Sequence, residues 1–127
     1  SDVCSSDLIS TQFALDEIFG INNLQFIPST FERAANSWTK QVDILHIDGF
    51  HDYESVSDDH EQWKKHLHND SIILFHDVLE FPKDLGKYFD ELDGYKFIRP
   101  QSCGLGVYCK NKKLLDFVKE LSLNIPV

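Results

Sequence analysis

The sequence predicts an α/β domain with a mostly parallel sheet that is covered by helices on both faces. Residues 42–47 and 72–75 are largely apolar runs of strand length, and the segment between them carries apolar side chains at helical spacing. Strands that alternate with helices in this way form parallel sheets. Each run ends in a polar cluster, at residues 48–51 and 76–77. Ligands bind beyond the carboxyl ends of such strands, so these two clusters form the candidate site.

The elements before this region are expected to be short. Residues 10–19 predict a helix that Gly20 ends, and residues 24–27 predict a strand that Pro28 closes. A short helix is expected over residues 30–38, before the strand at 42–47. The helix after that strand ends at Asn69-Asp70. It is marked by side chains at steps of three and four, namely Tyr53, Val56, His60, Trp63 and Leu67.

After the strand at 72–75, Pro82 is expected to open a helix at its first turn. The inner face of that helix carries Leu85, Phe89 and Leu92. Asp93-Gly94 predicts a turn, strands are expected over 95–98 and 105–109, and a helix over 114–121 follows. Because no long helix separates the last two strands, we expect them to pair in antiparallel orientation.

The composition excludes two classes of partner. The chain has 127 residues and a formal net charge of −9, with 21 acidic against 12 basic side chains. This balance argues against nucleic acid, because phosphate binding needs clustered Lys and Arg. No apolar run reaches the roughly 20 residues of a membrane helix, so no membrane partner is expected. Three scattered cysteines do not make a disulfide framework, which predicts a reducing, cytoplasmic setting; they are Cys4, Cys103 and Cys109.

Residues 1–8 stand apart from the rest of the chain. They are mostly polar, have no periodicity, and resemble the translation in one frame of a common sequencing-library adapter. We therefore expect them to be non-native and exclude them from the fold. The natural chain is then expected to continue upstream of residue 9.

Asp48 and Asp77 are the central residues of the candidate site. Each follows a buried strand, and if the two strands are neighbours the carboxylates converge on one point. Two carboxylates suit a hard divalent ion such as Mg²⁺. His51 is placed to act as a general base, because imidazole exchanges protons near neutral pH. The structural alternative is that both aspartates only cap the helices that follow them.

Three segments together resemble a family of class I S-adenosylmethionine-dependent methyltransferases. They are the strand end His46-Ile-Asp-Gly-Phe-His-Asp-Tyr53, the strand end at His76-Asp77, and Gly104-Leu-Gly-Val107; the first continues with Val56, Asp59 and Trp63. The resemblance covers residues 20–110. It implies a Rossmann-like sheet with an antiparallel last strand, and S-adenosylmethionine as the cofactor.

The resemblance also implies residue roles. Related sugar O-methyltransferases hold magnesium with acidic residues at these two strand ends and use a histidine as the base. Asp48 and Asp77 are then metal ligands, and His51 deprotonates a substrate hydroxyl. His76 stands where the metal-dependent relatives carry an acidic residue, which makes it an unusual further ligand. For cofactor binding, the resemblance assigns Asp48 and Ser29, a position near the adenine.

Two parts of the family's cofactor site are not found in this sequence. These are the Gly-x-Gly loop after the first strand and the acidic residue after the second. Gly104-Leu-Gly106 is not that loop, because it leads into a strand. We expect residues 9–127 to be the C-terminal portion of a single Rossmann-like methyltransferase domain without its first strands and glycine-rich loop. Such a fragment is expected to bind the cofactor weakly and to be inactive by itself.

Three functions are open to such a chain. The leading one is a methyltransferase that acts on a hydroxyl of a small molecule or sugar, assisted by a divalent metal. A non-haem iron oxygenase is the alternative enzyme, because His46, Asp48 and His76 mimic a two-histidine, one-carboxylate triad. Alternation of strands and helices argues against that alternative, and otherwise His46 is expected to be a core histidine. The third is a non-catalytic Rossmann-like binding module.

Overall fold

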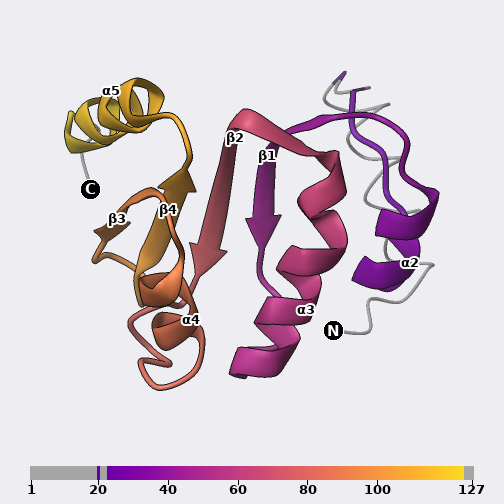
Figure 1. Ribbon diagram of the computed structural model, residues 1–127, viewed down its shortest axis with the longest axis horizontal. Helices are drawn as coiled ribbons and strands as arrows, with labels where there is room; N and C mark the ends of the chain where they lie inside the picture. Colours follow the sequence, from indigo (N-terminus) through magenta and orange to yellow (C-terminus); the bar gives the residue numbers. More distant parts are fainter. Residues whose placement is uncertain (1–19, 21–22, 125–127) are drawn as a thin grey trace. The chain divides into compact units, whose positions relative to one another are not determined.

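The structure is a computed structural model that describes residue 20 and residues 23–124 (Figure 1). The chain divides into two units, residues 1–37 and 38–127, and each is described by itself. Residues 1–8 and the helix expected over 10–19 lie outside the described residues. In the first unit, helix α2 spans Phe31–Ser37, which confirms the short helix expected there.

The strand expected at residues 24–27 is wrong. These residues form no regular secondary structure, and the side chains of Leu24 and Ile27 are 48% and 41% exposed. An extended segment becomes a strand only when a neighbour completes its hydrogen-bond ladder. Within the described part of this unit no second strand provides that ladder. The apolar composition of residues 24–27 suited a strand, but composition does not show whether a partner strand is present.

The second unit contains a four-stranded sheet among the residues described (Figure 1). Its order is β1-β2-β4-β3, with bounds Val42–Ile47, Leu67–His76, Leu105–Cys109 and Tyr95–Arg99 respectively. Strands β1 and β2 are parallel, whereas β4 is antiparallel to both β2 and β3. It follows that β1, β2 and β3 share one direction and only the last strand is reversed. This is the mostly parallel sheet with an antiparallel last strand that the sequence predicted.

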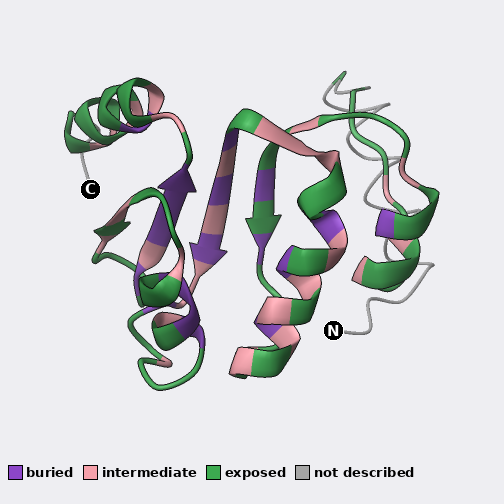
Figure 2. Ribbon diagram, in the orientation of Figure 1, coloured by how far each residue is buried: buried purple, intermediate pink, exposed green. Residues whose placement is uncertain are grey.

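Helices cover both faces of this sheet, as predicted. On one face, Phe75 of β2 packs against His60 of α3 (Tyr53–Trp63) and against Phe89 of α4 (Leu85–Glu91). On the other face, Leu115 of α5 (Lys112–Leu123) joins Val107 and Cys109 of β4 in a buried cluster. Side chains alternate along a strand, so consecutive residues of β2 and β4 serve opposite faces. Figure 2 shows this alternation as bands along β2.

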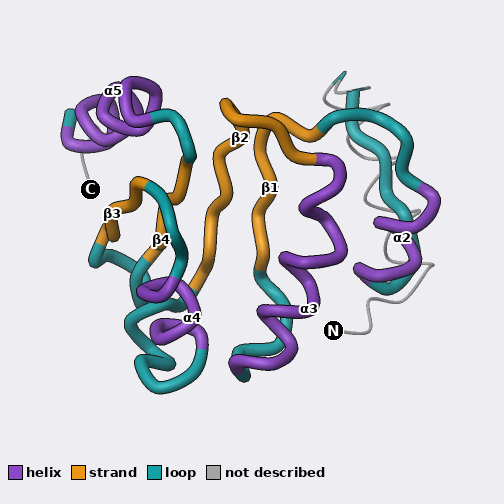
Figure 3. The backbone as a smooth tube through the Cα atoms, viewed as in Figure 1, coloured by secondary structure: helices purple, strands orange, loops and turns teal. Residues whose placement is uncertain are grey.

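Strand β2 is longer than predicted, and the helix before it is shorter. Leu67 was expected on the helix, but α3 ends at Trp63 and a 3₁₀ turn, η2 (Lys64–His66), leads directly into the strand (Figure 3). Leu67 pairs with Val42 of β1 instead. An apolar residue can satisfy either periodicity, and here the ladder with β1 determines the outcome.

Pro82 does not open helix α4, which begins at Leu85. The preceding turns are held against the 103–104 loop by two backbone hydrogen bonds, from Val78 N to Gly104 O (3.3 Å) and from Leu79 N to Cys103 O (3.0 Å). This docking delays the helix by three residues beyond the proline. The expected turn at residues 93–94 and the strands and helix that follow it are confirmed.

His46 was expected in the core, but the structure exposes it. Leu45 and Ile47 point toward the face that carries α3 and are buried. Alternation then sends His46 and Ile44 to the opposite face, where Ile44 is 61% exposed. The described residues therefore leave that face of β1 open to solvent.

Candidate active site at the strand ends

Asp48 and Asp77 follow adjacent parallel strands. Ile47 of β1 lies beside Phe75 of β2, so the two chains leave the sheet side by side. One ligand atom from each of Asp48, His51 and Asp77 lies within 4.8 Å of the other two. The convergence predicted from the two strand ends is therefore confirmed as geometry.

Neither aspartate caps the helix that follows it. The N-cap of α3 is Asp52, whose side chain accepts a hydrogen bond from Ser55 N (3.0 Å). That bond also lowers the pKa of the Asp52 carboxyl. Helix α4 has Asp84 at its N-cap position, with no side-chain cap bond. The capping explanation therefore does not account for Asp48 or Asp77.

Asp77 has an uncommon backbone conformation. Its φ of 67° lies in the left-handed region, which costs free energy for a residue other than glycine. Its carbonyl accepts hydrogen bonds from Glu80 N (3.1 Å) and Phe81 N (3.4 Å), which closes a tight turn. The turn holds the carboxylate at the strand end, where its side chain is only 17% exposed.

His51 lies between Asp77 and an aromatic ring. Its Nε2 is 3.0 Å from Asp77 Oδ2, and its ring stacks on Phe81 with centroids 4.2 Å apart and planes only 6° from parallel. With Asp77 ionised, Nε2 carries the hydrogen and donates it, which leaves Nδ1 unprotonated in the neutral ring. The side chain remains 32% exposed. This arrangement orients an imidazole that can accept a proton from a bound molecule.

His76 also faces both carboxylates. Its Nδ1 lies 3.0 Å from Asp77 Oδ2 and 3.4 Å from Asp48 Oδ1. These separations suit an ion pair, but the angles do not suit a hydrogen bond, and Nδ1 is buried without a hydrogen-bond partner. The nitrogen is therefore close to two acceptors without being satisfied by either of them.

Gly49 allows the close turn after β1. A Cβ at this position would lie 3.2 Å from Asp59 Oδ2 of α3. Burial raises the pKa of the Asp59 carboxyl, and repulsion from Asp58 and Asp52 raises it further. The loop that carries Asp48 and His51 thus packs directly over the first turns of the helix.

The Tyr53 side chain contacts helix α4. Its hydroxyl donates to Glu91 Oε2 (2.6 Å), and Lys87 Nζ lies over its ring at 5.5 Å. The bond to Glu91 raises the pKa of the Tyr53 phenol. Tyr53 therefore connects the start of α3 to α4.

Two depressions in the described surface lie elsewhere. One, of about 440 Å³, is lined by residues 93–95 and Lys110 at the opposite edge of the sheet; the other, of about 180 Å³, lies between β3 and α5. Neither is lined by a histidine, so neither offers the histidine–carboxylate combination of the strand ends. The chemistry of the side chains, and not the depth of the surface, identifies the candidate site.

The structure brings Asp48, His51, His76 and Asp77 together at the strand ends. Ser29 belongs to the other unit, where its hydroxyl donates to Thr30 O (3.2 Å). Phe81 is the residue that the sequence analysis missed. Its one signal in the sequence is an aromatic side chain in the loop just after Asp77, where the predicted elements gave it no packing role.

The four-stranded sheet with its antiparallel last strand is similar to the Rossmann-like sheet of class I S-adenosylmethionine-dependent methyltransferases, and two comparisons with known proteins support that family. The chain is similar to the crystal structure of a protein from Corynebacterium glutamicum, with a TM-score of 0.65 and 15% sequence identity, over 84% of this chain and 57% of that one. This likeness supports the Rossmann-like fold. Residues 8–78 match the family described as "Methyltransferase domain", and the chain belongs to this family.

A relative in sequence is an uncharacterized protein, y4gI, of Sinorhizobium fredii. It is 34% identical over 85 residues, which are 64% of this chain and 9% of that protein. The chain therefore spans about a tenth of that relative's length. In residue 20 and residues 23–124, no helix has the length and apolar character needed to cross a membrane.

Proposed function

We propose that this chain is part of a methyltransferase that uses S-adenosylmethionine to methylate a hydroxyl of a small molecule or sugar. One observation carries the proposal. In a chain of the methyltransferase family, the partly exposed side chain of His51 is oriented by Asp77 at the strand ends, with Nε2 3.0 Å from Asp77 Oδ2. Ligands bind at this edge of such sheets.

His51 supplies the base in this reaction. S-adenosylmethionine, when bound, supplies a methyl group that transfers to oxygen as its bond to sulfur breaks. His51 accepts the hydroxyl proton at Nδ1, because its Nε2 hydrogen is engaged by Asp77. Asp77 stabilises the imidazolium that results, since a carboxylate favours the charged ring. Phe81 restricts rotation of the ring through the stacked contact.

The surroundings favour a small neutral acceptor. Phe50, next to His51, is 71% exposed and offers an apolar surface beside the base. The net charge of −9 disfavours polyanions such as nucleic acid. A reducing, cytoplasmic setting belongs to the same proposal. Ser29 and Asp48 are proposed to contact the cofactor, as the family resemblance implies.

A divalent cation fits the donors that are present. Asp48 and Asp77 supply carboxylate oxygens on one side of the strand ends, and the unsatisfied His76 Nδ1 faces both of them. A cation held there would acidify and orient an acceptor hydroxyl. The base function of His51 does not depend on it.

His51→Ala in the full-length protein that carries this sequence tests the proposal. Transfer of a labelled methyl group from S-adenosylmethionine to a panel of sugars and small phenols is measured by mass spectrometry. Loss of a general base should lower the rate by about 10²- to 10⁴-fold. His68→Ala is the matched control, because it removes another histidine that contacts an aspartate. His68 lies at the start of β2, and the candidate site lies beyond the other end of that strand. Unchanged transfer by His51→Ala would contradict the assigned role.

Family membership favours methyl transfer over the iron oxygenase, whose triad also needs the exposed His46. The methyl-transfer assay also tests the third function, a non-catalytic binding module. A protein that binds S-adenosylhomocysteine but transfers no methyl group to any acceptor in the panel would support it.

A further inference from the structure

We propose that Tyr53 is a positioning residue, which holds His51 in place through the hydrogen bond between its own hydroxyl and Glu91. The proposal rests on the function proposed above, in which His51 is the base. It adds that the orientation of His51 depends on helix α4 as well as on Asp77 and Phe81. Tyr53 acts through His51, so this role requires no contact with the acceptor or the cofactor.

His51 and Tyr53 lie on either side of an extended residue. The backbone at Asp52 has φ −73° and ψ 150°. Side chains alternate along an extended segment, which places those of His51 and Tyr53 on one side and that of Asp52 on the other. Asp52 accordingly caps α3 through Ser55 N. His51 and Tyr53 both contact the segment 77–91, which runs from the residue after β2 to the end of α4.

Helix α4 contacts both the hydroxyl and the ring of Tyr53. The hydroxyl donates to Glu91 Oε2 at 2.6 Å, and Lys87 Nζ lies 5.5 Å from the centre of the ring. The ring also meets that of Tyr88 in a T-shaped contact, with centroids 5.4 Å apart. Tyr88 is buried, and its hydroxyl lies 2.6 Å from His60 Nδ1. These contacts restrict rotation of the phenol and therefore the path of the chain two residues after His51.

The bond from Tyr53 to Glu91 is suited to orienting a group more than to stabilising the fold. A carboxylate is a charged acceptor, and hydrogen bonds to charged groups are short and strong. Glu91 and Lys87 are both exposed, with Lys87 Nζ 3.9 Å from Glu91 Oε1. Solvent screens charged contacts at such a surface, so they add little to the free energy of unfolding. Loss of the bond should therefore displace His51 without unfolding the chain.

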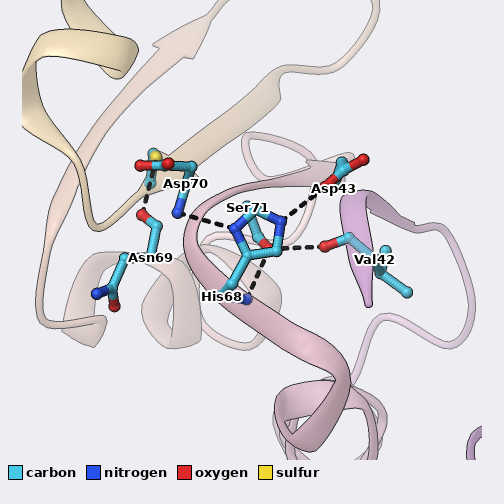
Figure 4. Close-up of polar contacts among 7 residues, drawn as sticks. Val42, Asp43, His68, Asn69, Asp70 and Ser71 are labelled. Carbon is cyan, nitrogen blue, oxygen red and sulfur yellow. Dashed lines mark hydrogen bonds and ion pairs between the residues drawn. The ribbon is translucent and has the colours of Figure 1, made fainter. Parts of the chain in front are cut away.

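Another histidine–aspartate contact is oriented without Tyr53. His68 Nε2 lies 2.7 Å from Asp43 Oδ1, and its Nδ1 accepts a hydrogen bond from Asp70 N at 3.2 Å (Figure 4). Both ring nitrogens of His68 are thus held by residues at the start of β1 and β2. The candidate site lies beyond the other end of these strands. His68 therefore provides an internal reference for changes that are confined to His51.

NMR of the chain with ¹⁵N-labelled histidine tests the positioning role without an activity assay. The unmodified chain should show the Nε2 proton of His51, because its bond to Asp77 slows exchange with water. Tyr53→Phe keeps the ring but removes the hydroxyl, and it should cause loss of this signal while the His68 signal persists. Glu91→Ala should have the same effect, whereas Glu91→Gln retains an acceptor oxygen and should keep the signal. His51→Ala assigns the signal, and circular dichroism confirms that each variant is folded.

Steady-state methyl transfer by the full-length protein that carries this sequence is the second measurement. Tyr53→Phe and Glu91→Ala should each lower kcat by about 5- to 20-fold, with KM for the acceptor within about twofold, because a displaced base slows the reaction more than it weakens binding. The double variant should be no slower than the slower single variant, since both changes remove one bond. Glu91→Gln should recover kcat to within about threefold, because its amide oxygen is a neutral acceptor.

Asp116→Ala is the matched control for the kinetic measurement. It removes another exposed carboxylate on a helix surface, which Lys112 Nζ contacts at 2.6 Å on α5. Neither residue contacts the segment 77–91 through a bond of this kind, so kcat should be unchanged.

Two results would overturn the proposal. One is a Tyr53→Phe variant that keeps the His51 signal and the kcat of the unmodified protein, which would leave the methyltransferase function intact. The other is loss of the His51 and His68 signals together, which would make Tyr53 a contributor to folding and not a positioning residue. In a protein that transfers no methyl group, loss of the His51 signal alone would support the positioning role although the proposed function fails.

Discussion

His51 and Asp77 are 26 positions apart in the chain, yet His51 Nε2 lies 3.0 Å from Asp77 Oδ2. The contact joins the loop after β1 to the residue that ends β2. It exists because β1 and β2 are parallel neighbours, which places both strand ends at one edge. The tight turn at Asp77 and the stacked ring of Phe81 hold the two groups in place.

Asp77→Asn should reduce turnover without preventing binding of the acceptor. An amide occupies the same space but cannot stabilise the imidazolium as a carboxylate does. We expect kcat for methyl transfer to fall by about 10- to 100-fold, with KM for the acceptor within about threefold, as for other groups that orient a reacting residue. Steady-state kinetics of the full-length protein provide the measurement. Asp43→Asn, at the other histidine–aspartate contact, should leave kcat unchanged. Equal kcat for Asp77→Asn and the unmodified protein would count against the His51–Asp77 pairing.

Removal of Asp52 should destabilise the fold more than removal of Asp48. Asp52 caps α3 through Ser55 N, whereas Asp48 caps no helix in the described part of the chain. Asp52→Ala should lower Tm by about 2 to 5 °C, and Asp48→Ala should change it by less than about 1 °C. Thermal unfolding followed by circular dichroism gives both values. A loss for Asp48→Ala as large as that for Asp52→Ala would assign Asp48 a structural role.

His60 should make the fold less stable in mild acid. It is 3% exposed, its Nδ1 lies 2.6 Å from the Tyr88 hydroxyl, and burial lowers its pKa to about 4, with a smaller contribution from Lys64. As the pH falls, the His60 side chain binds a proton near pH 6.5 in the unfolded chain but only near pH 4 in the folded chain. Stability is therefore fully present above pH 6.5 and is lost as the pH falls toward 4, by up to about 3 kcal/mol.

Urea unfolding at a series of pH values checks this expectation. His60→Gln keeps a polar group near Tyr88 but cannot titrate, so its unfolding free energy should change less between pH 6.5 and 4. Titration of the carboxylates changes the unfolding free energy of both proteins by the same amount, so the difference between the two pH profiles reports on His60. Identical pH profiles for the two proteins would show that His60 is not the group responsible.

Gly104 should tolerate no side chain. Its φ is +90°, and a Cβ there would lie 2.6 Å from Leu79 Cγ. Gly104→Ala should lower the free energy of unfolding by about 1 to 3 kcal/mol through backbone strain and overpacking. Leu79→Ala, combined with Gly104→Ala, removes the Leu79 Cγ and Cδ1 contacts but leaves the Leu79 Cβ at 2.9 Å, so it should recover part of the overpacking and none of the strain. A double-mutant cycle measures this coupling, and strict additivity would show that the two residues do not crowd each other.

Much of the fold follows from local patterns. The β1 strand at Val42–Ile47 has the predicted bounds, and α2, β3, β4 and α5 lie within two residues of theirs. These elements carry one clear periodicity and end at turn or cap residues. Two of the predictions that failed concern residues whose sequence pattern fitted more than one outcome. Leu67 fitted both a helix face and a strand, and residues 24–27 had the composition of a strand without a neighbour to pair with.

The sequence by itself determined which residue types follow the strands, and so placed two aspartates and two histidines at the edge where ligands bind. The tertiary structure decided how those groups pair. It directed His51 and not His46 toward Asp77, left His76 Nδ1 without a hydrogen bond, and stacked Phe81 on the base. The physical reason is that hydrophobic periodicity is a local property of the chain. Side-chain pairing across 26 residues depends on strand adjacency and on the turn at Asp77, which only the folded backbone provides.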